Sequence, residues 1–525
     1  MKNSEELRQQ LRSINRKSYP AYKGLKGLYH FGNYILSIDH VQGDPFASPS
    51  HVSIQISHRD AGFPVEYYKD TLTGTTLCDY LTRQFEKQVS QYSFRAKGSG
   101  KSGLLTVSHC GQEILSRTAC EITEKGITAR FFVGFPANGR TINATELEKI
   151  LFDFLPVCIQ KSFFYSSLNA KELQNYIELA EDQEFIRQTL PAKNLCAFIA
   201  DGSILPRESG ISSRPMKASV PFTSPDSLRI SINLPHKGKI TGMGIPKGIT
   251  LIVGGGYHGK STLLNALELG VYNHIPGDGR EYVITDATAV KLRSEDGRFI
   301  KDVDISMFIN DLPNKKDTRC FSTLDASGST SQAAGIAESM EAGSHLFLLD
   351  EDTSATNFMV RDAFMQQVIQ REKEPITPFL ERAEDLYKKA GISTILVAGS
   401  SGAFFHIADT IIQMDNYVPK DITASVKKLC SQYPLPAVSV TDFQLPHSHR
   451  IMSRPAESSK RLRHNSRGNH SDSGAAKPER LKTRISGTDG FSLGRQEIDL
   501  RYTEQLIDAE QTAALGLLLK YAVEH

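Results

Sequence analysis

Nine consecutive residues have the types and spacing of a loop that binds phosphate groups: Gly254, Gly255, Gly256, Tyr257, His258, Gly259, Lys260, Ser261 and Thr262. The glycines let the backbone turn several N–H groups toward phosphate oxygens. Lys260 supplies a positive charge for the β- and γ-phosphates, and Ser261 supplies a hydroxyl ligand for Mg²⁺. The segment therefore predicts a binding site for a nucleoside triphosphate.

The residues on either side place this loop between a strand and a helix, which is the context that the motif requires. Residues 249–253 are an apolar, strand-like run, and residues 262–267 have the pattern of a helix. A glycine-rich turn without a ligand is the alternative, and the flanking pattern makes it the weaker interpretation. His258 is expected to be a loop residue only.

Two carboxylates follow a second apolar run at residues 345–349, which predicts a buried parallel strand. Ligands bind at the carboxyl ends of such strands in open α/β folds. Asp350 is therefore expected to hold the water shell of the metal, and Glu351 is expected to polarise an attacking water as general base. The alternative is a strand that ends in three solvated acidic residues, 350–352, and the phosphate loop upstream argues against it.

Small residues precede a helical pattern at residues 332–342. Ser327, Gly328 and Ser329 would lie at the N-terminus of that helix, where backbone N–H groups favour an anion. They are therefore candidate contacts to a nucleotide. An ordinary helix cap is the alternative for this segment.

This serine–glycine pattern, placed between the phosphate loop and the acidic strand end, resembles the signature motif of the ABC ATPases. More specifically, the chain resembles the family of predicted ATPases of the ABC class, soluble proteins unrelated to transport. The segments that carry this resemblance cover most of the chain: residues 39–46, 202–210, 295–298, 304–306, 326–334, 350–358 and 374–378. The resemblance implies ATP and Mg²⁺ as cofactors and a homodimer in which the signature of one protomer closes over the γ-phosphate bound by the other. It also associates the chain with RNA metabolism.

One departure from ordinary ABC modules bears on turnover. Gly399, Ser400 and Ser401 stand where such modules carry a histidine that contacts the γ-phosphate. Ser400 is the candidate to replace it, although a hydroxyl can hydrogen-bond a phosphate but cannot act as an imidazole. The rate of turnover is therefore left open. The expected catalytic residues are Lys260, Glu351 and Ser400.

Two other loops differ from the usual pattern. Residues 354–357 stand where a loop ending in aspartate usually couples the two sites of a dimer. Residues 295–298 are the candidate for the glutamine loop, which has no closer equivalent in the sequence.

The length of 525 residues and the order of these patterns predict a three-domain α/β protein. Its centre is an ABC-type P-loop ATPase core with a mixed sheet, residues 222–420. An N-terminal α+β domain, residues 1–221, and a smaller C-terminal domain, residues 421–525, flank the core. The first boundary is placed at 221 because prolines interrupt regular structure there. Helices are expected after Ser4, over 75–91, over 170–188 and over 503–523.

The composition is that of a soluble globular protein, with 39% hydrophobic and 23% charged residues. No apolar stretch approaches the ~18–20 residues needed to cross a bilayer, and the first residues predict a helix rather than a signal peptide. Seven scattered cysteines without a C-x-x-C pair favour reduced thiols and argue against a zinc site. We therefore expect a cytoplasmic protein without a membrane partner.

A basic segment at about residues 454–486 stands out in a chain whose net charge is only +2. Residues 454–484 hold nine Lys or Arg and three Asp or Glu, together with many Ser, Gly and His. Such a composition cannot bury enough apolar surface to fold alone, so we expect a disordered loop. It is either a solvated linker or an electrostatic contact with the phosphates of RNA or another nucleic acid.

A second glycine-rich segment, residues 97–103, is not interpreted as a phosphate loop. Arg95 stands where the motif needs its first glycine, and the residues that follow are strand-like. A basic turn is the expected structure, in which Lys97 and Lys101 could contact nucleic-acid phosphates.

Three functions remain open at this level. The first is Mg²⁺-dependent ATP hydrolysis by an ABC-type dimer that is coupled to RNA binding or remodelling. The second is an ATP-gated clamp on nucleic acid or protein with little turnover, which the missing histidine favours. The third is a motor subunit for another protein complex. The base of the nucleotide is open too, because no base-recognition motif is visible.

Overall fold

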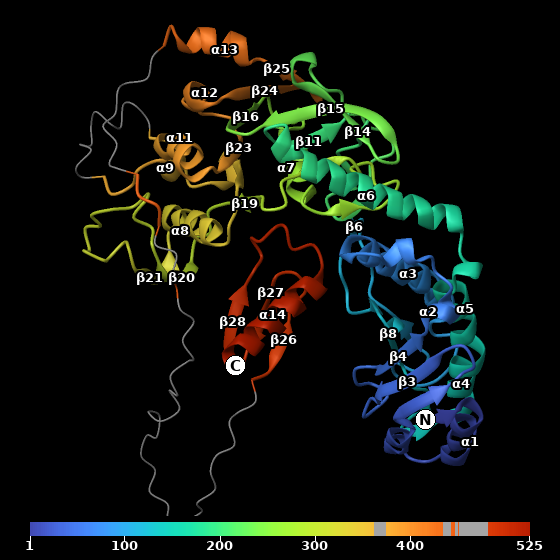
Figure 1. The fold of residues 1–525 in the computed structure, drawn as a ribbon. Coiled ribbons are helices and arrows are strands. Elements are labelled where there is room, and N and C mark those ends of the chain that lie inside the picture. Colours follow the sequence, from blue (N-terminus) through green and yellow to red (C-terminus); the bar gives the residue numbers. More distant parts are fainter. Residues whose placement is uncertain (362–373, 434–442, 447–449, 451–480) are drawn as a thin grey trace, which may run out of the picture.

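The computed structural model describes residues 1–361, 374–433, 443–446, 450 and 481–525. These residues form three units, and the N-terminal and central units lie side by side (Figure 1). The smaller C-terminal unit lies below the central unit in that view, beside the N-terminal one. No helix within the described residues is both long and apolar enough to cross a membrane.

The N-terminal unit is built on a sheet with the strand order β1-β2-β3-β4-β8-β5, in which β7 also pairs with β8. The pairs are antiparallel except for β1 with β2. Its strands are β1 (Lys2–Asn3), β2 (Gly27–His30), β3 (Ile35–His40), β4 (Ser50–Ile56), β5 (Leu105–Thr106), β7 (Cys120–Thr123) and β8 (Gly126–Val133). Its helices are α1 (Ser4–Ile14), α2 (His58–Ala61), α3 (Thr71–Tyr92), α4 (Ala144–Glu148) and α5 (Leu155–Phe163).

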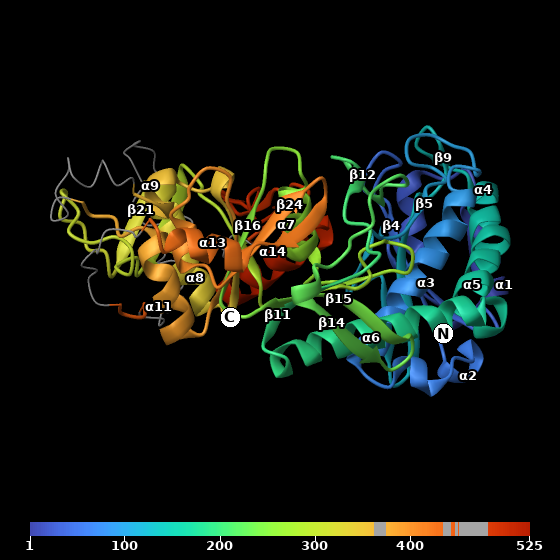
Figure 2. The same ribbon diagram turned by 90° about the horizontal axis from the view of Figure 1, so that it is seen from above.

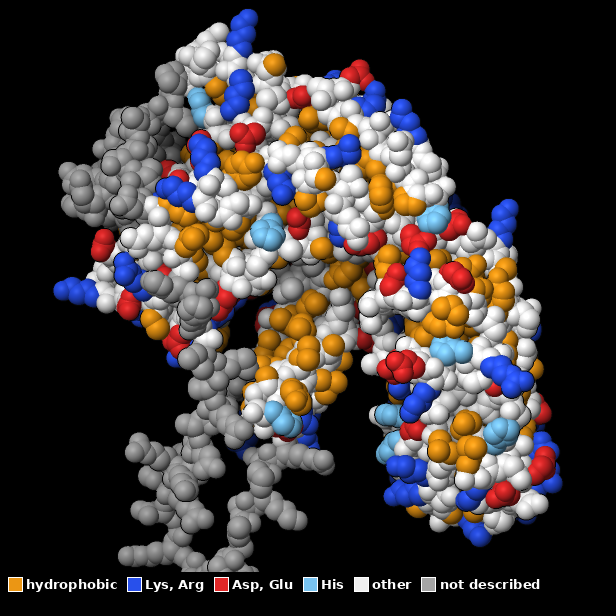
Figure 3. Space-filling model, in the orientation of Figure 1, with side chains coloured by type: hydrophobic (Ala, Val, Ile, Leu, Met, Phe, Trp, Pro, Cys, Tyr) orange, Lys and Arg blue, Asp and Glu red, His pale blue; other side chains and the backbone are white. Residues whose placement is uncertain are grey.

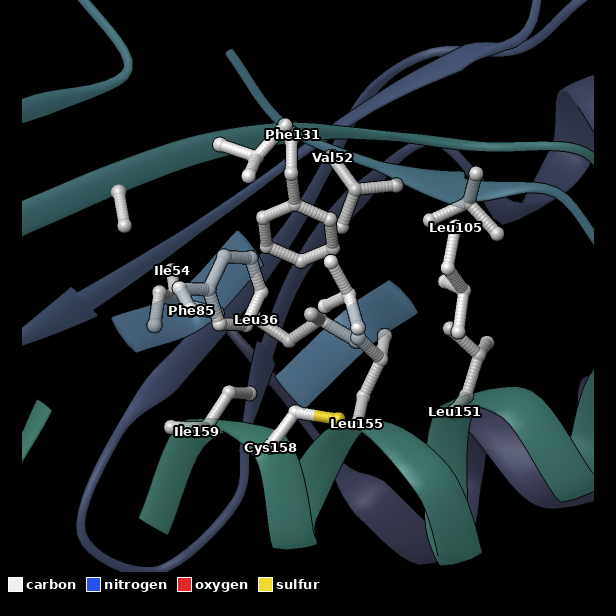
Figure 4. Close-up of a cluster of buried hydrophobic side chains, with 14 of the residues drawn as sticks. Leu36, Val52, Ile54, Phe85, Leu105, Phe131, Leu151, Leu155, Cys158 and Ile159 are labelled. Carbon is white, nitrogen blue, oxygen red and sulfur yellow. The ribbon is translucent and has the colours of Figure 1, made fainter. Parts of the chain in front are cut away.

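Helices α3 and α5 bury the hydrophobic core of this unit against the sheet (Figure 4). The ring of Phe85 in α3 lies 5.1 Å from the rings of both Phe131 and Phe163. The helix expected over 75–91 is confirmed and runs longer, because Asp70 and Thr73 form a capping box at its start. The helix expected after Ser4 is also confirmed.

Helix α6 (Ala170–Ala192) connects the N-terminal unit to the central unit, packing on α3 and on β11 (Leu195–Ala200). Strand β11 joins an antiparallel sheet with β14 (Arg229–Leu234), β15 (Gly238–Pro246) and β18 (Val283–Thr285). Residues before 221 therefore contribute to a sheet of the central unit. We propose that the N-terminal domain ends near residue 168, where the first structural unit ends.

The second sheet of the central unit has the order β19-β22-β23-β16-β24-β25 and is parallel apart from its last pair. Its strands are β16 (Ile249–Val253), β19 (Val290–Leu292), β22 (Leu346–Asp350), β23 (Ser393–Val397), β24 (Thr410–Asp415) and β25 (Val418–Asp421). The strand expected at 249–253 is confirmed, and the one expected at 345–349 is confirmed with a shift of one residue. Because β16 and β22 are parallel, the loops that follow them lie at the same edge of the sheet.

Helices and short strand pairs surround this sheet. The helices are α7 (Lys260–Leu269), α8 (Gly328–Glu341), α9 (Thr356–Met359), α11 (Phe379–Ala390), α12 (Phe404–Ile407) and α13 (Thr423–Cys430). Two strand pairs belong to the core: β12 (Arg207–Ser209) with β13 (Ser212–Pro215), and β20 (Arg298–Val303) with β21 (Phe321–Ala326). The pair of β9 (Ala137–Asn138) and β10 (Thr141–Ile142) lies in the N-terminal unit, and β6 (Glu113–Ile114) of that unit pairs with β17 (Asn273–His274) of the core. Figure 2 shows α8, α9, α11 and α13 at the end of the core that is far from the N-terminal unit.

The C-terminal unit is a small antiparallel sheet of β26 (Thr483–Ile485), β27 (Gly490–Leu493) and β28 (Gln496–Asp499), on which α14 (Ala509–Glu524) packs. The expected closing helix is present but begins at 509 rather than 503, because Asp508 caps it. Residues 454–480 of the expected basic loop lie outside the described residues, whereas 483–485 form a strand. The outer side of α14 contributes to the hydrophobic surface of this unit in Figure 3.

The loop before α14 is held by both other units. The carboxylate of Asp508 accepts a hydrogen bond of 2.8 Å from Arg117 in the N-terminal unit. In the central unit, the Lys291 backbone N–H donates to the Gln505 side chain at 3.1 Å, and the Tyr272 hydroxyl donates to the Gln505 carbonyl at 2.7 Å. The three units therefore meet at residues 505–508.

The aromatic cluster around Phe85 predicts that removing this ring strongly destabilises the N-terminal unit. Phe85→Ala should lower the free energy of unfolding by about 3–5 kcal/mol, because it removes a fully buried ring and leaves a cavity. Phe132→Ala, at a side chain that is 40% exposed, is the matched control and should cost much less. Thermal and urea unfolding followed by circular dichroism would measure both. Equal losses for the two variants would contradict this assignment of the core.

Candidate functional site

The loop from Gly254 to Gly259 connects strand β16 to helix α7, as the sequence predicts. Gly254 has a φ of +144°, and a Cβ there would lie 2.4 Å from the Met414 carbonyl oxygen, so only glycine fits. The Lys260 ammonium group lies back over the loop and donates to the carbonyls of Gly254 at 2.7 Å and Gly255 at 3.0 Å. The exposed Gly255 and Gly256 complete an open cradle above the first turn of α7.

Two side chains of this loop face different surroundings. Tyr257 has a φ of 63° and is 99% exposed. The Nδ1 atom of His258 accepts a hydrogen bond of 2.9 Å from the Asn416 backbone N–H, in the turn between β24 and β25. His258 therefore fastens the phosphate loop to a neighbouring turn, which agrees with the expectation that it is a loop residue.

Ser261 and Thr262 lie in the first turn of α7 and border a pocket of about 660 Å³ next to the phosphate loop. The opposite walls are mostly apolar and include the side chains of Leu205, Met216, Val220, Phe222, Met414 and Tyr417. Such walls suit the planar, largely apolar surface of a nucleotide base. Sequence reasoning missed this pocket, because its lining comes from three separate segments; the segment at residues 202–210 was singled out only for its resemblance.

The hairpin of β12 and β13 beside this pocket is anchored by buried charges. Arg207 in β12 donates to the Asp278 carboxylate at 2.9 Å, and the His274 ring lies 2.8 Å from the same carboxylate. Burial alone would raise the pKa of Asp278, but the hydrogen bond from His274 and the charge of Arg207 outweigh it and lower the pKa. The ionised carboxylate therefore fixes the hairpin next to the phosphate loop.

Asp350 ends strand β22 and is 7% exposed. One of its carboxylate oxygens accepts a hydrogen bond of 3.1 Å from the Asp352 backbone N–H. Burial raises the pKa of Asp350, and the positive charges of Lys291 and Lys260 act against this shift.

These residues fit the way in which Mg²⁺ binds in nucleotide sites. Within the described residues, no group of three or more His, Cys, Asp or Glu side chains is arranged to hold a metal ion. Mg²⁺ needs no such cage, since one carboxylate, one hydroxyl, waters and the phosphates of the nucleotide complete its coordination. Asp350 and Ser261 are the residues that would supply the protein ligands.

Glu351 is held by the end of the neighbouring strand β23. One carboxylate oxygen accepts hydrogen bonds from the backbone N–H groups of Gly399 at 2.7 Å and Ser400 at 3.0 Å. The other accepts a hydrogen bond of 2.6 Å from the Ser400 hydroxyl. Burial would raise the pKa of Glu351, but these hydrogen bonds outweigh it and lower the pKa. The structure therefore brings two predicted residues, Glu351 and Ser400, into direct contact.

The third predicted group, Ser327, Gly328 and Ser329, forms the beginning of α8. The Ser327 side chain is exposed, and its hydroxyl lies 2.9 Å from that of Thr330 and 3.3 Å from that of Ser329. Figure 1 draws α8 and α7 on different parts of the core. Ser327 therefore lies at the surface while Ser329 is buried, and the Ser327 hydroxyl is turned toward those of Ser329 and Thr330.

The model for the P-loop domain of the ABC ATPases matches residues 169–448. The chain belongs to the ATPases of the ABC class. A model described as the N-terminal part of ATPases of the ABC class matches residues 4–166, and the model of the MRB1590 C-terminal domain matches residues 482–525. These limits coincide with the three structural units of this ATPase.

Among curated proteins, the uncharacterized protein MJ1628 of Methanocaldococcus jannaschii is 31% identical over 266 residues. The aligned region is 48% of this chain and 58% of that protein, so the chain spans less than two thirds of the length of this relative.

Two solved structures are also similar. An ATP-binding cassette of an ABC transporter, MJ1267 in its ADP conformation, is 13% identical, with 37% of this chain and 88% of that chain covered and a TM-score of 0.25. CbiO1 from Clostridium perfringens, part of the ABC transporter complex CbiONQ, is 14% identical, with 37% and 86% covered and a TM-score of 0.24.

The hydroxyl of Ser400 should matter for the rate of ATP hydrolysis. Ser400→Ala removes one of three hydrogen bonds to Glu351, so the carboxylate loses its fixed orientation and kcat should fall about tenfold. Ser401→Ala, which removes the neighbouring hydroxyl, is the control and should keep the wild-type rate. Steady-state phosphate release measures both variants. Equal rates for the two variants would show that the Ser400 hydroxyl does not position Glu351.

Proposed function

We propose that the protein binds ATP with Mg²⁺ and hydrolyses it. The observation that carries this proposal is the fixed carboxylate of Glu351, which accepts three hydrogen bonds from Gly399 and Ser400 beside the end of β22. A general base must be ionised and must be held within reach of the water that it activates. The lowered pKa of Glu351 supports the first condition, and the three donors support the second.

Different residues would bind the phosphates, the Mg²⁺ ion and the base of the nucleotide. The backbone of residues 254–259 and the N-terminus of α7 would cradle the phosphates, while Lys260 would move from the loop carbonyls to the β- and γ-phosphates. Ser261 and Asp350 would hold Mg²⁺, which neutralises charge on the phosphates. The apolar pocket beside Thr262 would take the base.

We further propose a homodimer in the cytoplasm as the working form. The exposed hydroxyl of Ser327 and the N-terminus of α8 form an anion-binding end that points to the surface of the core. In the ABC class, as the resemblance implies, this end closes over the γ-phosphate bound by a second copy. Ser327, Gly328 and Ser329 would then complete the site of the partner.

RNA is the substrate class that we favour for coupling to hydrolysis. The excess of Lys and Arg over residues 454–484 supports it, as does the association of the resembling family with RNA metabolism. An ATP-gated clamp with little turnover is the second candidate. It is favoured by the serine at position 400, because a hydroxyl cannot act as the imidazole of ordinary ABC modules. A motor subunit for another protein complex is the third, and it would show no response to RNA.

Two substitutions should separate binding from chemistry. Glu351→Gln should retain ATP binding and lose hydrolysis, because the amide keeps the shape of the side chain but cannot accept a proton. Lys260→Ala should lose both, because it removes the charge that holds the phosphates. Equilibrium binding of a fluorescent ATP analogue and steady-state phosphate release would measure the two properties. Normal turnover in Glu351→Gln would remove the assignment of the base.

Salt should modulate any coupling to RNA. Single-stranded RNA should change the steady-state ATPase rate at low ionic strength, and the effect should shrink as salt is added, because contacts between phosphates and Lys or Arg release counterions. A pool of mixed-sequence RNA at two salt concentrations is a sufficient test, with heparin as a control for a general polyanion effect. A rate that RNA does not change at either concentration would favour the protein-directed motor.

A further inference from the structure

Three segments of the central unit meet at the beginning of α8. The Ser331 hydroxyl in α8 accepts a hydrogen bond of 2.9 Å from the Glu295 backbone N–H. The Ser294 backbone N–H donates to the Thr353 carbonyl at 3.0 Å. A Cβ on Gly328 would lie 3.3 Å from the Ser294 side chain. The segments at 294–296, 327–332 and 353–355 are therefore packed closely.

Gln332 makes the side-chain connection between α8 and the segment that carries Glu351. Its side chain is fully buried. The Gln332 amide nitrogen donates to the Ser354 hydroxyl at 3.0 Å, and its amide oxygen accepts from the Ala355 backbone N–H at 3.0 Å. The Ser354 hydroxyl in turn donates to the Asp350 carbonyl at 2.8 Å. Both ends of the Gln332 amide are thus used to hold residues 350–355.

We propose that Gln332 is a positioning residue for hydrolysis, which acts on Glu351 through Ser354 and Ala355. This inference rests on the proposed role of Glu351 as the base. The hydrogen bonds from Gly399 and Ser400 hold the Glu351 carboxylate from one side, and Gln332 holds the backbone that follows it from the other. A displacement of about 1 Å at a reacting group can reduce a rate by a factor of about a hundred.

The position of Gln332 also connects the N-terminus of α8 to the segment that follows Glu351. It lies in the first turns of α8, the helix whose exposed N-terminus we assign to the nucleotide of a second copy. Movement of α8 when that nucleotide binds would be passed to residues 354 and 355 through the Gln332 amide. This connection lies in the loop where ordinary ABC modules carry an aspartate, which residues 354–357 lack.

Gln332→Leu tests the proposal because it roughly keeps the volume of the side chain and removes the hydrogen bonds to Ser354 and Ala355, together with the longer one to the Met359 sulfur at 3.6 Å. It should lower kcat about tenfold to a hundredfold and leave the Kd for ADP unchanged. Gln183→Leu is the matched control, since Gln183 is also fully buried and its amide donates at 2.9 Å to the carbonyls of His274 and Glu281, outside the segment 350–355. It should lower Tm by a similar amount and keep kcat.

A double-mutant cycle separates a specific role from a general loss of stability. If Gln332 acts through Ser354, Gln332→Leu with Ser354→Ala should lower kcat little more than either substitution alone, whereas Gln183→Leu with Ser354→Ala should be additive. Ser354→Ala on its own should lower kcat, which keeps the test decisive if Gln332→Leu does not fold. Wild-type kcat in Gln332→Leu or in Ser354→Ala would overturn the inference while Glu351→Gln remains inactive. Absence of hydrolysis in the wild type would overturn the proposed function, and the inference with it.

Discussion

The site depends on the parallel pairing of β22 with β23. In this register Asp350 lies opposite Val397, so the residue after each strand emerges at the same edge of the sheet. Glu351 then meets the backbone N–H groups of Gly399 and Ser400, which keep its carboxylate ionised and oriented. A shift of one residue would exchange the side chains on the two buried faces of β22 and move Glu351 away from Gly399 and Ser400, so it would remove the site.

Ion pairs attach the C-terminal unit to the core and to the N-terminal unit. Lys291 in β19 forms an ion pair with Glu504 of the C-terminal unit and another, at 3.1 Å, with Glu268 of α7. Strand β19 leads directly to Ser294, whose hydroxyl donates a hydrogen bond to the Thr353 carbonyl, two residues after Glu351. Arg117 connects the same C-terminal segment to Asp79 of the N-terminal unit at 3.0 Å. The segment at residues 504–508 therefore contacts both the N-terminal unit and the strand that leads to Ser294.

The sequence predicted the parts of the site that follow from local patterns. The phosphate loop, the buried strand before Asp350 and the helix after Ser327 each have a distinctive composition over a few residues, and each lies where it was expected. The contact between Glu351 and Ser400 was not predicted: Ser400 was expected to contact the γ-phosphate, and its bond to Glu351 depends on which strands are neighbours. The base pocket and the contacts of Gln332 with Ser354 and Ala355 were not predicted for the same reason, since the partners are distant in sequence. Helix α14 begins later than expected because Asp508 caps it and residues 505–508 contact the other units.

We propose that a second copy of the chain completes the hydrolytic site. Mixing two inactive variants tests this shared site most directly. Lys260→Ala removes the lysine that binds the phosphates, and Ser327→Arg blocks the exposed N-terminus of α8. If the sites are shared, mixed dimers contain one intact site, and the mixture should regain ATPase activity that neither variant has alone. A mixture that exchanges subunits and stays inactive would contradict a shared site, as would full activity of Ser327→Arg by itself.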